Sequence, residues 1–204
     1  MPPTLSLPAS ACLIRPYKNT PSEARTLAHE ANNPKIAKWM TNAFPHPYTL
    51  SDAEDWLRRA SPGAESGVIA FAISTANSDT ADNGTETETE TLIGSIGLKP
   101  RTDIHHRTVE LGYWLAEAHW GRGVATEAVR VFSGWVFRAP EFAHVVRIEA
   151  EVFEGNTGSQ KVLEKAGYTL EARKRWAVEK GGVLLDVFLY VLLRDGEGKE
   201  ITAN

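Results

Sequence analysis

The feature of this sequence that most constrains its fold is residues 109–139, which read as a strand, a glycine turn and a helix in direct succession. The strand-like run covers 109–116, and a short turn leads from it to the step Gly121-Arg122-Gly123. Apolar residues then recur at helical spacing, at Val124, Ala125, Ala128, Val129, Phe132, Trp135 and Val136. Unpaired backbone N–H groups and the positive end of the helix dipole converge at such a turn, and glycine lets an anion approach closely. The stretch therefore predicts a phosphate-binding turn.

Two common phosphate-binding motifs fit this turn poorly. A Walker A loop requires G-x-x-x-x-G-K-[ST], which the chain does not contain, so mononucleotide hydrolysis is disfavoured. A dinucleotide-binding fingerprint reads G-x-G-x-x-G, and Thr126 stands where its third glycine belongs. A dinucleotide-binding protein therefore remains only as a weak alternative.

The whole phrase resembles the acetyl-coenzyme A signature [RQ]-x-x-G-x-[GA] of the GNAT superfamily of N-acetyltransferases. The matching residues here are Trp120-Gly121-Arg122-Gly123-Val124-Ala125. Tryptophan at the first position departs from the general pattern but resembles the branch that acetylates ribosomal-protein N-termini, where W-G-x-G-x-A-T-E-A is usual. A second phrase is similar to N-x-x-S-x-x-x-x-x-K-x-G-[FY] of the same branch, and it runs from Asn156 through Ser159 and Lys165 to Gly167 and Tyr168. The resemblance extends over residues 13–194.

The order of elements, together with this resemblance, predicts a single α/β domain over residues 11–194. Its sheet is expected to be mixed, twisted and mostly antiparallel, with one parallel β-α-β crossover, as in GNAT-like acyl-CoA N-acyltransferases. Expected strands cover 12–17, 68–74, 91–98, 109–116, 144–153, 168–177 and 183–193. Expected helices cover 21–30, 34–40, 51–60 and 157–166, besides the helix that begins at 124. Residues 1–10 are expected to be an N-terminal extension and 195–204 a polar tail.

Three local patterns sharpen these expectations. Ser51, with Glu54 three residues later, predicts a capping box at the start of the third helix. Gly167 is expected to end the helix over 157–166 in a left-handed conformation. Residues 75–90 end in a repeating Thr-Glu tract and contain no large apolar residue, so we expect a long, low-complexity hairpin loop insertion there, with an acidic binding arm as the minor alternative.

Composition excludes several classes of function. The chain has 204 residues and a formal net charge of −4, which suits one domain and argues against a nucleic-acid scaffold. No apolar run approaches the ~20 residues of a membrane span, and residues 1–10 lack the features of a signal peptide, so we expect a cytoplasmic protein that does not bind membranes. Cys12 is interpreted as a small apolar residue, and His105 with His106 as a solvated pair, so no metal is expected.

The chemistry of acetyl transfer suggests the catalytic residues. An amine that is protonated at neutral pH must lose a proton before it attacks a thioester, and the leaving thiolate needs a proton donor. Ser159 matches the serine that the ribosomal-protein branch uses as this donor, with helix capping as its structural alternative. As the base we favour Glu110, whose pKa would rise if apolar strand neighbours desolvated it; an ordinary half-exposed strand residue is an equal alternative. The branch places a glutamate nineteen residues after the serine, where this chain has Val178, and a side chain at the adjacent Glu179 would turn to the other face of a strand.

The resemblance implies acetyl-CoA as the co-substrate. The turn would hold the pyrophosphate, the end of the strand over 109–116 would contact the pantetheine through its backbone, and Asn156 would bind the pantetheine or a nearby water. Arg122 and Lys165 are the expected partners of the phosphates. The predicted acetyl-CoA-binding residues are Trp114, Leu115, Ala116, Trp120, Gly121, Arg122, Gly123, Val124, Ala125, Thr126, Asn156, Ser159 and Lys165.

These observations together predict an acetyl-CoA-dependent N-acetyltransferase. Its acceptor is expected to be a primary amine, carried either by a small molecule or by a peptide N-terminus. A catalytically silent CoA-binding or sensor domain is the alternative, because Val178 stands at the possible base position. The acceptor pocket is expected to form from the opening helices, residues 41–48 and the final hairpin. The apolar strand over 183–193 could contribute to a homodimer.

Overall fold

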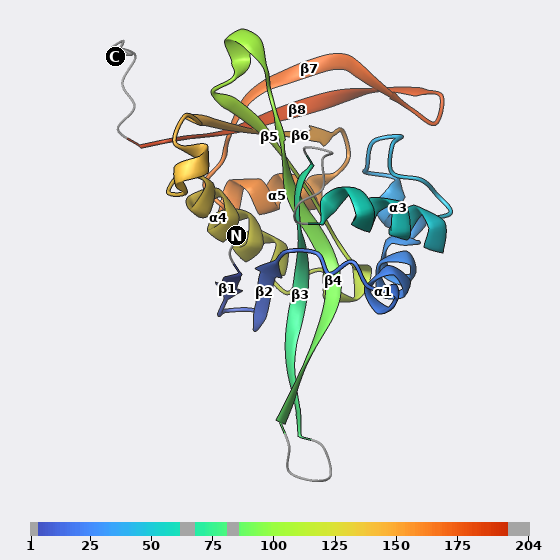
Figure 1. Ribbon diagram of the computed structural model, residues 1–204. Coiled ribbons are helices and arrows are strands. Elements are labelled where there is room, and N and C mark those ends of the chain that lie inside the picture. The colour runs from blue at the N-terminus through green and yellow to red at the C-terminus, as the bar shows by residue number, and fades with distance from the viewer. Residues whose placement is uncertain (1–3, 62–67, 81–85, 196–204) are drawn as a thin grey trace.

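The computed structural model describes residues 4–61, 68–80 and 86–195. Its eight strands form one sheet in the order β1-β2-β3-β4-β5-β6-β8-β7 (Figure 1). The strands are β1 Leu5–Leu7, β2 Cys12–Arg15, β3 Ile69–Thr80, β4 Glu86–Pro100, β5 Thr108–Leu115, β6 Arg147–Phe153, β7 Thr169–Lys180 and β8 Val183–Leu193. All neighbours are antiparallel except β5 and β6. The predicted mixed, mostly antiparallel α/β sheet with one parallel crossover is confirmed.

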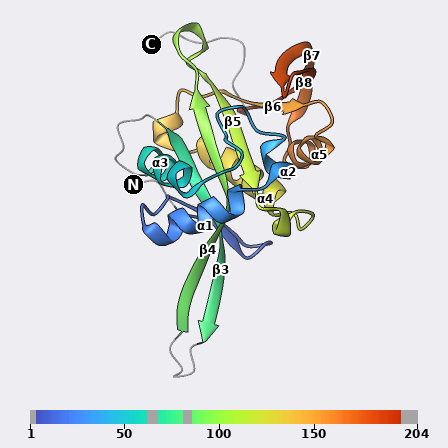
Figure 2. The same cartoon turned by 90° about the vertical axis from the view of Figure 1, so that its right-hand side faces the viewer.

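Helices cover both faces of this sheet. The helices are α1 Pro21–Ala31, α2 Pro34–Ala37, α3 Leu50–Ala60, α4 Val124–Val136 and α5 Thr157–Lys165, with 3-10 turns at Asp103–His105, Glu117–His119 and Pro140–Phe142. Figures 1 and 2 show α1 and α3 on one side of the sheet and α4 and α5 on the other. Two hydrophobic clusters correspond to these layers, one built around α4 and one around α1 and α3.

Strand β5 contributes side chains to both layers. Val109, Leu111 and Leu115 belong to the cluster around α4, whereas Trp114 belongs to the cluster around α1 and α3. The pairing of β5 with β6 ends at Glu110 opposite Glu149. Beyond that point β5 pairs only with β4, and β6 only with β8. The two parallel strands therefore separate toward their carboxyl ends and leave a gap between them.

The predicted N-terminal extension over 1–10 is wrong in part, because β1 pairs with β2 at the edge of the sheet. Leu7 is fully buried in the cluster around α4. Two hydrogen bonds hold the hairpin, since the backbone N–H of Ala9 and the hydroxyl of Ser10 donate to the carboxylate of Glu127 on α4, at 2.9 and 2.7 Å. A partner 118 residues away cannot be read from a three-residue pattern.

The predicted loop over 75–90 is also wrong in part. Strands β3 and β4 continue as a two-stranded ribbon, in register from Ala76 opposite Glu90 to Thr80 opposite Glu86. Figure 1 shows the ribbon projecting beyond the rest of the sheet. A ladder is made by backbone groups, and threonine is a favourable strand residue, so a polar tract can continue a hairpin without adding to a core. Residues 81–85, like the tail beyond 195, lie outside the described residues.

The termini of several helices differ from the predictions by a few residues. Helix α3 begins at Leu50, and its capping box is Thr49 with Asp52, two residues before the predicted pair. Both pairs fit the same short motif, so the motif alone does not select between them. The strand β2 ends at Arg15, β6 begins at Arg147, and α2 ends at Ala37, each shorter than predicted. Gly167 has φ +99°, as expected for a left-handed helix end.

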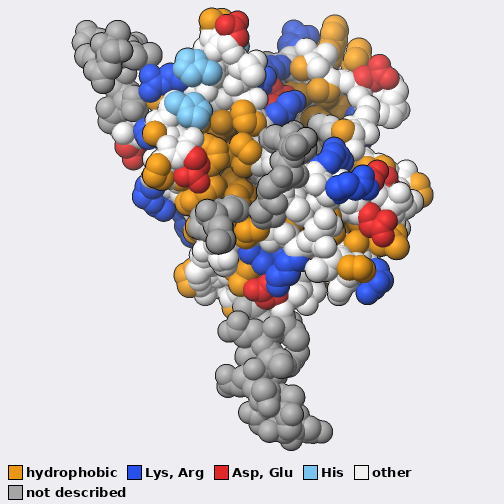
Figure 3. Space-filling model, in the orientation of Figure 1, with side chains coloured by type: hydrophobic (Ala, Val, Ile, Leu, Met, Phe, Trp, Pro, Cys, Tyr) orange, Lys and Arg blue, Asp and Glu red, His pale blue; other side chains and the backbone are white. Residues whose placement is uncertain are grey.

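The surface carries both signs of charge. Figure 3 shows Lys and Arg side chains interspersed with Asp and Glu over the same face. Charged side chains also pair between strands, for example Arg147 of β6 with Glu171 of β7 and Lys174 of β7 with Glu151 of β6. Among the described residues, no helix is long and apolar enough to cross a bilayer.

Candidate active site

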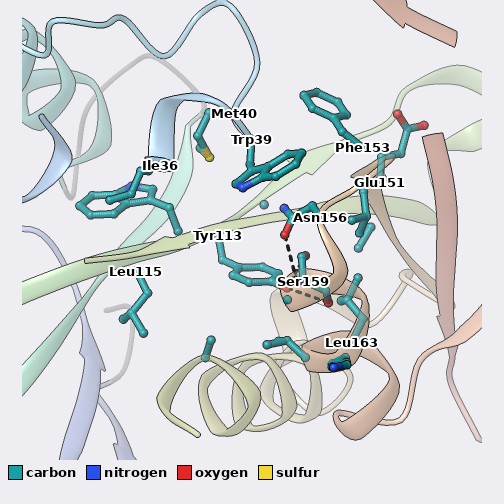
Figure 4. Close-up of a pocket in the computed structure, with 18 of the residues that line it drawn as sticks. Ile36, Trp39, Met40, Tyr113, Leu115, Glu151, Phe153, Asn156, Ser159 and Leu163 are labelled. Atoms are coloured by element: carbon teal, nitrogen blue, oxygen red, sulfur yellow. Dashed lines mark hydrogen bonds between the residues drawn. The ribbon is translucent and has the colours of Figure 1, made fainter. Parts of the chain in front are cut away.

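A cavity of about 950 Å³ occupies the gap between β5 and β6. Its walls come from α2, β5, the turn before α4, β6, α5 and the end of β7. Figure 4 shows side chains from these elements facing one another across the gap. The cavity follows directly from the separation of the two parallel strands, because paired strands would leave no room between them.

One end of the cavity is the glycine turn that leads into α4. Gly121 and Gly123 have φ +74° and +83°, and a Cβ built on either would meet no described atom within 4 Å. Gly123 is the N-cap of α4, and no side chain among the described residues caps it. The first intrahelical bond runs from the N–H of Glu127 to the carbonyl of Gly123, so the preceding N–H groups have no partner inside the helix. This end is therefore suited to an anion.

The turn is attached to the end of β5 by Trp120. Its indole Nε1–H donates a 2.7 Å hydrogen bond to the carbonyl of Leu115. The N–H of Ala116 donates to the carbonyl of Ile93 on β4, at 2.7 Å. Backbone groups alternate in direction along an antiparallel strand, so the N–H groups of Tyr113 and Leu115 are directed to the side of β6, where the cavity lies.

In the middle of the cavity, the hydroxyl of Tyr113 lies 2.7 Å from Oγ of Ser159 (Figure 4). Ser159 sits in the first turn of α5, where its backbone N–H donates to Oδ1 of Asn156, the N-cap, at 3.1 Å. Burial raises the pKa of Tyr113 to about 12, partly offset by the hydrogen bond to Ser159. The phenol of Tyr113 is thus neutral at physiological pH. The side chain that caps α5 is that of Asn156, so the hydroxyl of Ser159 is not used as the cap.

Glu110 lies where the two strands begin to separate, and it lines the cavity. Its carboxylate is 3.3 Å from the guanidinium of Arg101, which also pairs with Glu149 at 3.3 Å. The side chain is 27% exposed. Val109 and Leu111 point to the opposite face. Of the two surroundings considered for Glu110, the structure shows the half-exposed strand residue, and its immediate neighbour is a cation rather than apolar side chains.

The other end of the cavity lies between α2 and the end of β7. Its apolar lining is supplied by Ile36, Trp39, Met40, Phe153 and Val178. Glu151 and Glu179 line the same region, and Glu151 pairs with Lys174 at 2.5 Å. Val178 and Glu179 both line the cavity, although consecutive strand residues were expected to face opposite ways. The pairing of β7 with β8 is irregular between Lys174 and Val178, and such an irregularity changes the direction of the side chains near it.

A family model described as an acetyltransferase (GNAT) domain matches residues 12–169. This chain belongs to the GNAT acetyltransferase family. YdaF of Bacillus subtilis (strain 168), which carries a provisional name as a ribosomal N-acetyltransferase, is 32% identical over 189 residues, covering 88% of this GNAT chain and 91% of YdaF. The p20 protein of Bacillus licheniformis, called an uncharacterized N-acetyltransferase, is 35% identical over 107 residues, 52% of this chain and 58% of p20.

A solved structure of Mycobacterium smegmatis RimJ in complex with CoA-disulfide has a TM-score of 0.70 and 23% identity, covering 94% of this chain and 86% of that one. At that identity the likeness concerns the fold alone. The alignments with several curated relatives, p20 among them, span between half and three fifths of those proteins' length.

Within this GNAT domain, most of the predicted acetyl-CoA-binding residues line one cavity. They are Trp114, Leu115, Trp120, Gly121, Gly123, Val124, Ala125, Thr126, Asn156, Ser159 and Lys165. Ala116 and Arg122 are not among its lining residues. Ala116 is buried with its N–H bonded to β4, and the side chain of Arg122 is exposed. Both predicted catalytic residues line the cavity: Glu110 where β5 and β6 begin to separate, and Ser159 on α5, beside Tyr113.

Several lining residues of this GNAT chain were not singled out as functional from the sequence. Tyr113 lies in the stretch ELGYWL, residues 110–115, directly before the turn, and only that position could have drawn attention to it. Trp39, Phe153 and Glu151 carry no motif at all. His119 lines the cavity beside the turn, where burial lowers its pKa and the charge of Arg122 lowers it further. Among the described residues, no group of three or more His, Cys, Asp or Glu side chains could hold a metal ion.

Proposed function

We propose that this protein is an acetyl-CoA-dependent N-acetyltransferase that moves an acetyl group to a primary amine by direct attack of the amine on the thioester. The observation that carries the proposal is the continuity of one cavity. It joins the uncapped start of α4 to the Tyr113–Ser159 pair and then to an apolar end. Membership of the GNAT family and the RimJ complex with CoA-disulfide support the choice of co-substrate.

The fit of acetyl-CoA rests on three features of the described residues. The free N–H groups of Val124 to Thr126 would receive the pyrophosphate, and the absence of side chains at Gly121 and Gly123 leaves room for it. The N–H groups of Tyr113 and Leu115 would bind the pantetheine and stabilise the oxyanion that forms during attack. Lys165, at the end of α5, lines the same cavity and would contribute a positive charge toward the phosphates of CoA.

Proton transfer would then involve residues on both sides of the thioester. The acceptor ammonium would first give one proton to Glu110, to Glu179 or to a water held by either carboxylate. The neutral amine would then attack the thioester carbonyl, and its nitrogen would lose a second proton to solvent. When the tetrahedral intermediate collapses, the C–S bond breaks, and Ser159 would donate its hydroxyl proton to the leaving thiolate. Tyr113 would position that hydroxyl by donating its own hydrogen bond to Oγ. The proton would return to Ser159 through solvent that enters the open cavity.

The test is mass spectrometry combined with thiol release, using acetyl-CoA and a mixed panel of amines. The panel contains peptides with free N-termini, amino acid amides, polyamines and aminoglycosides. A mass gain of one acetyl group on any member, with stoichiometric thiol release, is the expected result. Tight CoA binding without acetylation of any member would overturn the enzymatic proposal and favour a silent CoA-binding domain.

A further inference from the structure

The end of the cavity away from α4 is a pocket lined by apolar side chains. Trp39 is half-buried and packs against the turn after β6, where a Cβ on Gly155 would meet its ring at 3.4 Å. Figure 4 shows Met40, Trp39 and Phe153 along the side of the cleft opposite Tyr113. Ile36, from α2, is buried and also lines the cavity. Since the proposed co-substrate would occupy the end at α4, this pocket is left for the body of the acceptor.

The charges around this pocket are largely compensated. Of the lining carboxylates, Glu110 is paired with Arg101 and Glu151 with Lys174. Glu179 is exposed at the rim, and no ion pair of it is found within the described part of the chain. A polyamine or an aminoglycoside carries several positive charges and needs several free carboxylates to replace the water it loses. The pocket offers one such carboxylate, which matches an acceptor with one amine.

The pKa of the acceptor amine further narrows the class of acceptor that the pocket suits. An α-amine with a pKa near ~7.8 is about one-third neutral at pH 7.5, whereas about one lysine-type amine in a thousand is neutral at that pH. An apolar lining disfavours the charged ammonium and therefore helps an α-amine to lose its proton. Removing the proton of a lysine-type amine, with a pKa near ~10.4, is harder by about 2.6 pKa units than removing that of an α-amine.

We infer that the acceptor is an α-amine whose own residue carries an apolar or aromatic side chain, and that Trp39, Met40 and Phe153 bind that side chain. The inference rests on the proposed N-acetyltransferase function. A free amino acid derivative and a peptide N-terminus present the same chemistry at this point. The experiment separates the two sources.

The experiment compares kcat/KM for acceptors that differ in one feature. Peptides that begin with Leu or Phe are compared with otherwise identical peptides that begin with Asp or Gly, with leucine amide and with spermidine. We expect Leu and Phe peptides to exceed Asp and Gly peptides by about tenfold or more, the factor that burial of one apolar side chain supplies. Spermidine is expected to be slower still. Leucine amide as fast as the Leu peptide would assign the site to small molecules, and a much slower amide would assign it to peptides.

Variants test the same inference from the protein side. Trp39→Ala and Phe153→Ala are expected to reduce the preference for Leu over Gly about tenfold while CoA binding, measured by calorimetry, stays unchanged. Trp176→Ala is the matched control, because Trp176 is 67% exposed on β7 and does not line the cavity. Met40→Glu adds a carboxylate to the pocket and is expected to reduce the difference in kcat/KM between spermidine and the Leu peptide.

The outcomes distinguish the inference from the function on which it rests. A higher kcat/KM for spermidine or an aminoglycoside than for the Leu peptide would overturn the inference and leave the N-acetyltransferase proposal intact. The same holds if kcat/KM differs by less than twofold between peptides with different first residues. Acetylation of no acceptor at all would overturn both.

Discussion

The phenolic oxygen of Tyr113 on β5 lies 2.7 Å from Oγ of Ser159 on α5, which joins two elements 46 residues apart in the chain. Each hydroxyl can donate only one proton. If Tyr113 donates to Oγ, the hydrogen of Ser159 is free to point into the cavity, toward the position proposed for the thioester sulfur. Asn156 fixes the backbone of Ser159 independently, at 3.1 Å. Tyr113 is therefore a positioning residue in the proposed mechanism.

Tyr113→Phe is expected to lower kcat by about tenfold with little change in the KM for acetyl-CoA, because the ring is kept and only the positioning hydroxyl is lost. Ser159→Ala is expected to lower kcat by about a hundredfold, as loss of a general acid does. Steady-state kinetics of both variants and of the double variant provides the check. The double variant should be no slower than Ser159→Ala within a factor of about three, since the residues act as one unit. Additive losses would show that Tyr113 acts separately from Ser159.

The buried tyrosines predict an alkaline limit of stability. Burial raises the pKa of Tyr17 and of Tyr113 to about 12. The unfolded value is near ~10, so the folded protein binds more protons between these limits. The stability from these groups is therefore fully present below about pH 10 and is lost as the pH rises toward about 12. Urea unfolding at pH 8, 9.5 and 11 should show the free energy of unfolding falling above pH 10, less steeply in Tyr113→Phe. Equal values at pH 8 and 11 would contradict this.

The strands and helices of the sheet were predictable because their signals are local. The alternation of β5, the helical spacing of α4 and the left-handed Gly167 all depend on neighbours within a few residues. The hairpin of β1 with β2 was not predictable, since its anchor is Glu127, 118 residues further along the chain. The polar ribbon of β3 and β4 was missed because it is made by backbone pairing rather than by apolar side chains.

The candidate site shows the same division. The turn at Gly121 and Gly123 was predicted, since positive φ and an uncapped helix start are encoded in adjacent residues. The environment of Glu110 was not, because its sequence neighbours lie on the other face of β5 and its spatial neighbour, Arg101, follows β4. The pairing of Tyr113 with Ser159 depends on where α5 packs relative to β5, which no short motif specifies.

Gly123→Ala is expected to weaken CoA binding by tenfold or more. At φ +83° an alanine is strained by about 1 kcal/mol, and its methyl group would occupy the open space proposed for the pyrophosphate. Gly134→Ala is the matched control on the same helix. Its Cβ would meet only the flexible end of Arg138, at 3.4 Å, and an alanine within a helix stabilises it by up to about 1 kcal/mol. Calorimetry with CoA and thermal unfolding of both variants separate lost binding from lost stability. Equal CoA affinity in Gly123→Ala and the unsubstituted protein would remove the turn as the pyrophosphate site.

Glu110→Gln tests the favoured base. The variant is expected to lower kcat at pH 7.5 by about a hundredfold, the usual contribution of a general base, while CoA affinity is nearly unchanged. Its matched control is Glu149→Gln. Glu149 pairs with the same Arg101 at the same 3.3 Å, and with Arg147 at 2.7 Å, but it does not line the cavity. Its loss therefore perturbs these ion pairs without touching the acceptor.

The comparison of the two variants decides the role of Glu110. A slow Glu110→Gln beside a normal Glu149→Gln is the result expected of a base. Equal losses in both would mean that the Arg101 ion pair supports the strands where they separate and that Glu110 takes no proton. An unchanged rate in Glu110→Gln would remove it as the base and leave Glu179, at the rim of the same pocket, as the carboxylate to replace next.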